Sequence, residues 1–226
     1  AMMVSGNLAA VAGGALGGDL TLKVLLPALD ALASPPTSFE GELHLDVGLS
    51  GTVEHPEATG TLLLDNLVVY GLNHSEKPIQ YQVEQVAMAW AITGHELQVT
   101  KGTVKWADGE MQLTGTVDTQ TTELQANLGL EGISLSEAIR QASGPPKAWT
   151  TFTADGEMNA TGTLSPLSMQ ADFKLAVIDL LVNNGPVASR STERLLEVPR
   201  SRLSGRLELD PDGIRIHAKD AVFGAT

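Results

Sequence analysis

The sequence predicts a mainly β protein, built as one extended and curled antiparallel meander with one or two short helices. Three observations predict it. Apolar and polar residues alternate with a period of two in many segments, turn sequences rich in Gly and Asp separate those segments, and helical periodicity is rare. A sheet with one apolar face needs a covering layer, and the sequence offers few amphipathic helices to supply it.

Strict alternation marks the clearest strands. The alternating segments are Glu42–Leu49, Glu96–Thr100, Met111–Thr114, Glu123–Leu128, Arg206–Asp210 and Ile214–Ala218. Because successive side chains of a strand point to opposite faces, Leu43, Leu45 and Val47 should share one side of the sheet.

Turn sequences predict how the strands are joined. Asp108-Gly109 is a pair favoured where a tight hairpin turn needs positive φ. The segment 210–213 (Asp-Pro-Asp-Gly) has proline at the second turn position and glycine at the fourth, which is typical of a type I turn. Asp155-Gly156 is expected to form a further turn between alternating segments. Such short links indicate consecutive antiparallel pairing.

Few segments favour a helix. Ile133–Ala142 has Ser134 and Glu137 at capping-box spacing and is followed by Gly-Pro-Pro, so we expect a helix there. Ser189–Val198 is a candidate for a second short helix, ended by a proline. Leu20–Leu32 fits either a helix or a strand, since a proline interrupts its apolar run.

Composition excludes several classes of function. The 226 residues carry a formal net charge of -13, which argues against binding a nucleic-acid backbone. The absence of cysteine excludes disulfides, thiolate zinc sites and cysteine nucleophiles. The five histidines are scattered, and the sequence has neither a phosphate-binding loop nor a nucleophile elbow. We therefore expect no enzyme activity, no cofactor, no metal site, and no membrane-spanning helix among residues 1–226.

The basic residues gather near the end of the sequence. Half of them lie in one window: Arg190, Arg194, Arg200, Arg202, Arg206, Arg215 and Lys219. This window either contacts anionic lipid headgroups or an acidic partner, or it forms a solvated face whose charges pair among themselves.

Two glycine-led segments resemble each other. Gly51–Pro56 (GTVEHP) precedes Ala58–Val69, and Gly162–Pro166 (GTLSP) precedes Met169–Val182, about 110 residues later. This phrase, followed by a long strand meander, resembles the TamB and AsmA-like proteins of the bacterial envelope, which are relatives of the repeating β-groove lipid-transfer proteins. The resemblance covers residues 40–130 well and 155–226 loosely.

The resemblance implies an architecture and its boundaries. It implies a half-pipe, or β-taco, with an apolar interior. Its expected parts are an N-terminal edge segment (1–38), a first β-groove module (39–130), a helix and linker (131–150), and a second module (151–226) that is truncated at its end.

The resemblance also implies a function. The chain would be a non-catalytic segment of an envelope-spanning protein that moves phospholipid between the inner and outer membranes. The expected lining of its groove is Leu43, Leu45, Val47, Leu97, Val99, Met111, Leu113, Leu124, Leu128, Leu207, Leu209, Ile214 and Ile216. Each of these residues equally fits the ordinary core of a closed sandwich.

Partners and location follow from the same resemblance. The expected partners are phospholipid acyl chains, adjoining β-groove modules of the same chain and barrel assembly proteins of the outer membrane. The expected location is the periplasm of a Gram-negative bacterium, with an inner-membrane anchor outside this sequence. Two alternatives stay open: a scaffold for outer-membrane barrel assembly or secretion, and a purely structural sandwich repeat.

Overall fold

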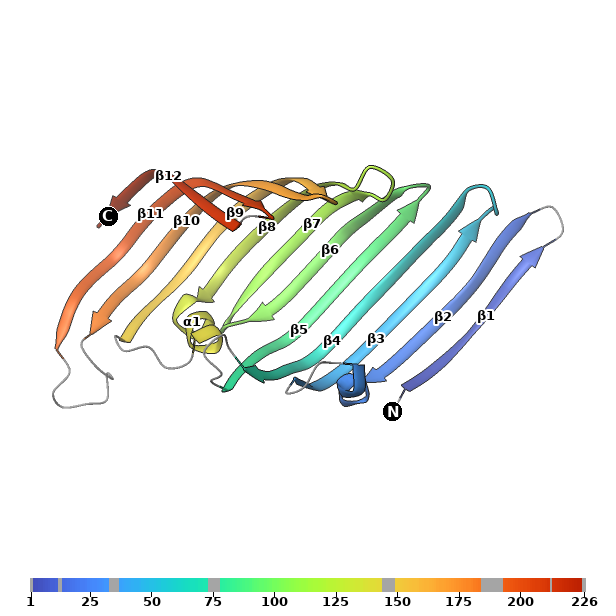
Figure 1. Cartoon of the computed structure of the whole chain (residues 1–226), viewed down its shortest axis with the longest axis horizontal. Helices are drawn as coiled ribbons and strands as arrows, with labels where there is room; N and C mark the ends of the chain where they lie inside the picture. The colour runs from blue at the N-terminus through green and yellow to red at the C-terminus, as the bar shows by residue number, and fades with distance from the viewer. Residues whose placement is uncertain are drawn as a thin grey trace.

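The protein is one open antiparallel sheet of twelve strands in the order β1 to β12, so each strand is bonded only to its neighbours in sequence (Figure 1). The computed structural model describes residues 2–11, 14–32, 37–72, 78–143, 149–183, 193–211 and 213–224. The elements are β1 (Met2–Val11), β2 (Ala15–Leu25), the 3₁₀ helix η1 (Leu26–Leu32), β3 (Ser38–Gly51), β4 (Pro56–Leu72), β5 (Pro78–Thr93), β6 (Glu96–Trp106), β7 (Gly109–Asp118), β8 (Glu123–Ser134), the helix α1 (Leu135–Ser143), β9 (Trp149–Leu164), β10 (Leu167–Asn183), β11 (Arg194–Asp210) and β12 (Gly213–Phe223). The predicted meander, curled into an open half-pipe with little helix, is confirmed.

The pairing register keeps apolar residues on one side of the sheet. Leu45 is paired with Leu22 on β2 and with Leu62 on β4, and Leu62 is paired in turn with Met88 on β5. Directly paired residues of antiparallel strands lie on the same face. Followed across the whole ladder, these pairs define the apolar face, which is the side of the sheet that carries Leu45.

Irregularities in the ladder bend the strands. The register shifts between Glu40 and Glu42 on β3, between Val99 and Gly102 on β6, and between Ser204 and Gly205 on β11. A bulge of this kind increases local twist and bends the strand that contains it. Bends repeated from strand to strand produce the curl of the half-pipe.

The two similar sequence segments occupy equivalent places six strands apart. Gly51–Pro56 forms the turn before β4, and Gly162–Pro166 forms the turn before β10; both strands have 17 residues. Each strand contains one residue with positive φ, Asn66 at 52° and Asp179 at 53°. A short helix also precedes each hairpin, η1 before β3 and α1 before β9. The ladder continues from β1 to β12, so the division into modules at residues 131–150 stays a prediction.

Two predicted hairpins form, and one does not. The β6–β7 turn forms, but its positive φ angles belong to Ala107 and Asp108, because Trp106 is paired with Gly109. Gly109 is required for a different reason: a Cβ there would lie 2.5 Å from the carbonyl oxygen of Glu131. The β11–β12 turn also forms, with the N–H of Gly213 donating to Oδ1 of Asp210 at 3.2 Å, although Asp212 lies outside the described residues.

The turn expected at Asp155-Gly156 is wrong, because both residues lie inside β9. Asp155 has a bonding role instead: its Oδ1 accepts the N–H of Gly132 at 2.7 Å. At Gly156, a Cβ would lie 2.3 Å from the carbonyl oxygen of Lys174, so the glycine permits close contact between two strands.

The helix expected at Ile133–Ala142 is confirmed as α1, which begins two residues later. The N–H of Glu137 donates to Oγ of Ser134 at 3.3 Å, as expected for an N-cap. Leu20–Leu32 divides into strand β2 and helix η1.

The second helix, Ser189–Val198, is wrong where the structure describes it. Residues 189–192 lie outside the described residues, and 194–198 belong to β11. Here Leu196 is paired with Val182 and Val198 with Leu180, so pairing with β10 overrides local helix preference.

Aromatic rings lie over glycines on the apolar face. A Cβ at Gly60 would lie 2.4 Å from Cζ2 of Trp90, its cross-strand partner. A Cβ at Gly205 would likewise lie 2.8 Å from Cζ of Phe173. The missing side chain therefore makes room for an aromatic ring next to the glycine.

We predict that Gly60→Val destabilises the fold by about 1–3 kcal/mol, since the added carbons displace the indole of Trp90 and press on the carbonyl oxygen of Asp46. Urea unfolding measures the effect. Gly17→Val is the matched control, because nothing lies within 4 Å of a Cβ at that strand glycine. Equal stability of the two variants would contradict the packing of Trp90 over Gly60.

Candidate functional site

All thirteen predicted lining residues occupy backbone positions on the apolar face. The pairs that connect them include Val99 with Gly115, Leu113 with Leu128, and Leu207 with Ile216. The set comes from β3 (Leu43, Leu45, Val47), β6 (Leu97, Val99), β7 (Met111, Leu113), β8 (Leu124, Leu128), β11 (Leu207, Leu209) and β12 (Ile214, Ile216). The register thus brings together residues that are more than 170 positions apart in the sequence.

These side chains are half-buried. The exceptions are Ile216, which is 64% exposed on the edge strand, and Ile214, whose side chain lies outside the described residues. Among the described residues, no second sheet covers this face. A closed sandwich would bury these positions, so the arrangement is an open trough and not a sealed core. Occupation of the trough by lipid stays a prediction.

The register adds trough residues that local alternation did not reveal. They include Leu20 and Leu22 on β2, Leu62 and Leu64 on β4, Met88 and Trp90 on β5, Met158 on β9, and Phe173 and Leu175 on β10. In β4 and β10 the sequence reads as a nearly continuous apolar run, so the buried face cannot be chosen from the sequence alone. Cross-strand pairing makes that choice.

Helix α1 fills a notch in one wall of the trough. β6 is last paired with β5 at Val83, and β8 is last paired with β9 at Thr153, so residues 78–82 and 149–152 have no strand on that side. α1 contacts both β5 and β9 and lies between their lower ends (Figure 1). The helix therefore completes a wall that the shorter strands β6 to β8 leave open.

Two side chains of α1 replace the missing ladder bonds. Oε1 of Gln141 accepts the backbone N–H of Gln82 on β5 at 3.0 Å, and Oγ of Ser136 accepts the N–H of Phe152 on β9 at 3.0 Å. The same Oε1 accepts Nε1 of Trp106 at 3.1 Å. Partly buried backbone donors need partners, and α1 supplies them at both borders of the notch.

Apolar contacts hold α1 against the trough. Ala138 packs with the buried Ala107 and Ile133, and the partly buried Trp106, Met111 and Leu130 surround this cluster. Met111, Leu130 and Ile133 belong to the apolar face. The helix thus covers the lower part of the trough on β6 to β8 and leaves the upper part, with Leu113 and Leu128, uncovered by it.

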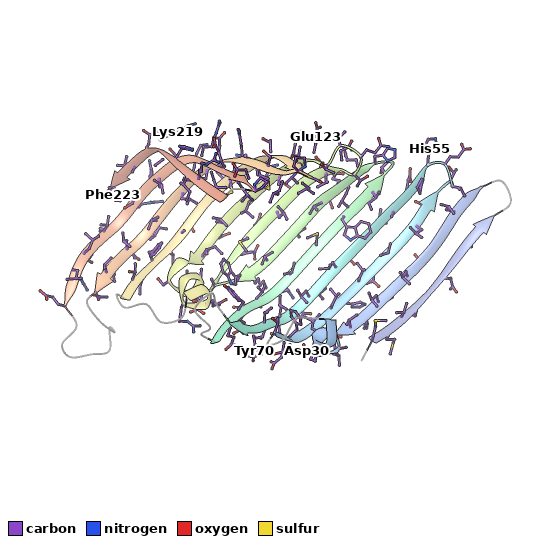
Figure 2. The ribbon with its side chains drawn as sticks, viewed as in Figure 1. Asp30, His55, Tyr70, Glu123, Lys219 and Phe223 are labelled. Carbon is purple, nitrogen blue, oxygen red and sulfur yellow. The ribbon has the colours of Figure 1, made fainter. Side chains whose placement is uncertain are left out.

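The opposite face of the sheet carries paired charges. The side chains of the sheet are drawn in Figure 2, where Lys219 and Glu123 are labelled. Nε of Arg206 lies 3.0 Å from Oδ1 of Asp172, which also faces Lys219 at 3.8 Å. The hydrogen bonds from Arg206 lower the pKa of Asp172.

Most described members of the basic window have an acidic partner. Arg215 pairs with Asp210 at 2.7 Å, and Arg194 pairs with Glu197. Arg190 lies outside the described residues. These pairs favour the solvated-face interpretation of the basic window.

A hollow of about 550 Å³ opens on the charged face, between β9 and β12. It forms over the small residues Ala176 and Ser204 and is bordered by Lys174, Arg202 and Asp220, among others. Nζ of Lys174 is already bonded to Glu157 at 2.7 Å. Because both acids and bases border it, the hollow does not define a site for an ion of one sign.

Comparison with known proteins adds no family assignment. No protein-family model matches the sequence, and neither a curated protein nor a solved structure is significantly similar to it. In the described part of the chain, no helix has the length and hydropathy needed to cross a bilayer, and no three His, Asp or Glu side chains gather as a metal site. The trough is therefore the feature from which a function has to be argued.

We predict that Gln141→Leu destabilises the protein by about 1–3 kcal/mol, because it leaves the partly buried donors of Gln82 and Trp106 without an acceptor. Gln141 itself is 6% exposed. Urea unfolding followed by tryptophan fluorescence measures the loss. Gln98→Leu, on the exposed face of β6, is the control and should change stability by much less. A stable Gln141→Leu variant would show that α1 does not complete the wall.

The helix should also weaken in acid. Hydrogen bonds from Arg140 and Gln141 lower the pKa of Glu137, so its contribution to stability is complete above the ordinary pKa of glutamate and is lost as pH falls through the lowered value. We predict that Glu137→Gln unfolds at lower urea concentration than the unmodified chain at neutral pH. The difference should vanish well below the ordinary pKa; a difference that persists there would contradict this role.

Proposed function

We propose that the chain is a non-catalytic lipid-binding segment that carries phospholipid between the inner and outer membranes of a Gram-negative bacterium. One observation supports the proposal: the apolar face extends over all twelve strands, and in the described part of the chain no second sheet covers it and α1 covers only its lower part on β6 to β8. Leaving apolar surface in water costs about 25 cal/mol per Å². An occupant that covers the trough is therefore strongly favoured.

An acyl chain has the right chemistry for that occupant. Each buried methylene contributes about 0.8 kcal/mol, and a flexible hydrocarbon adapts to a floor of Leu, Val, Met and flat aromatic rings. The lining offers few polar groups to fix one position, so a bound chain is free to slide along the sheet. The headgroup stays at the open side of the trough, where water reaches it.

Phospholipid should crosslink to one face of each strand and not to the other. A photo-crosslinking residue at Leu45 or Leu113 should give phospholipid adducts in cells, detected by mass spectrometry of the purified protein. The matched controls are Asp46 and Thr114, the next residues along the same strands, which lie on the opposite face. Adducts at the controls alone, or at neither set, would contradict lipid binding in the trough.

A second function is favoured by a different observation. The sheet is open, and β1 and β12 each have one unpaired edge. Such edges accept a further strand, as a scaffold for outer-membrane barrel assembly or an adjoining β-groove module requires. Lipid analysis of the purified chain, set beside pull-downs with barrel precursors, distinguishes a lipid carrier from an assembly scaffold.

A further inference from the structure

Four neighbouring rows of paired residues cross the whole sheet on its apolar face. They are the rows that contain Leu43, Leu45, Val47 and Leu49 of β3, and direct cross-strand pairs connect each row from β1 to β12. Every position in these rows is Gly, Ala, Val, Leu, Ile, Met, Phe or Trp. Trp90 on β5 is the one residue in the four rows whose side chain has a hydrogen-bond donor, the indole N–H.

The indole of Trp90 lies beside Gly60, its partner on β4. Cζ2 and Cε2 are the ring atoms nearest to the position of a Cβ at Gly60, with Cε2 at 2.6 Å, and Cε2 is bonded to Nε1. Helix α1 packs on Met111, which belongs to the row of Leu43, two rows away from Trp90. The nitrogen edge of the ring is therefore held next to Gly60, in a row on which the helix does not pack.

Nε1 of Trp90 has no hydrogen-bond acceptor in the part of the chain that the structure describes, whereas Nε1 of Trp106 donates to Gln141. Trp90 is half-buried. Among the described residues, Oγ of Ser201 is the only buried side-chain polar atom without a partner, so Nε1 of Trp90 is within reach of water in the open trough.

A lipid that covers the trough displaces this water. An indole N–H enclosed in hydrocarbon without an acceptor costs free energy, and a methylene group cannot accept its hydrogen bond. The ester carbonyl oxygens are the acceptors joined directly to the acyl chains of a phospholipid. For the same reason, tryptophan is enriched where an apolar environment meets a polar one.

We propose that Nε1 of Trp90 donates to an ester carbonyl oxygen of the bound lipid and so positions the headgroup end of that lipid at β5. The inference rests on the proposed function and adds a residue that positions the lipid. A matched position lies on β10, where Phe173 packs beside Gly205 in the same way but has no donor. Among the four rows, β5 is thus the one strand that can hold a carbonyl oxygen by a side chain.

Calorimetric titration of the chain 1–226 with two lipids tests the proposal. The probes are a short-chain diacyl phosphatidylcholine and the dialkyl ether of the same chain length, which lacks the carbonyl oxygens. The ratio of the two affinities, in favour of the diacyl lipid, should fall about two- to tenfold in Trp90→Phe, because one hydrogen bond is lost. Phe173→Leu is the control and should leave the ratio unchanged. Both affinities are measured on the same variant, so a fraction of unfolded protein does not alter their ratio.

A second measurement uses the unmodified chain, which has three tryptophans. In the nitrogen–proton NMR spectrum, one of the three indole N–H signals should lie at lower field in the diacyl complex than in the dialkyl complex. Binding of both lipids with the same ratio in Trp90→Phe as in the unmodified chain, or indole signals that do not distinguish the two complexes, would overturn the role of Trp90 alone. Binding of neither lipid would overturn the proposed function and this inference with it.

Discussion

The register of each strand pair, which decides the face on which every side chain lies, is the constraint on which the structure depends. A shift of one residue in any hairpin moves the apolar side chains of that strand to the other face. The ladder contains several bulges, yet Val99 and Val104, on either side of the β6 bulge, both stay on the trough side. The bulges therefore bend the strands while the apolar side chains stay on one face. The sheet can be curved and still have a single apolar face.

Much of this arrangement could be predicted because it is local. Alternation in Glu42–Leu49 and Met111–Thr114 fixes which side chains share a face, whatever the strand pairs with. Short turns then make neighbours in sequence neighbours in the sheet. For this reason residues of one face could be chosen from strands scattered along the chain, whereas their role as a lipid lining stays a prediction.

The remainder depends on contacts between distant residues. Arg194–Val198 has a plausible helical sequence, and only the partners Leu180 and Val182 on β10 make it a strand. The role of Gln141 could not be predicted, because nothing local reveals that β6 to β8 end before β5 does, which leaves the N–H of Gln82, 59 residues from Gln141, in need of an acceptor. The fit of Trp90 over Gly60 likewise appears only when the register is known.

The strict neighbour-to-neighbour order of the twelve strands has a consequence for folding. Every strand pair joins residues that are close in sequence, so no long loop has to close before any pair can form. Each new hairpin can add to the edge left by the one before it, as in solenoid proteins whose stability is a sum over adjacent units. A chain of this kind is suited to folding progressively from one end, because no segment has to wait for a distant partner.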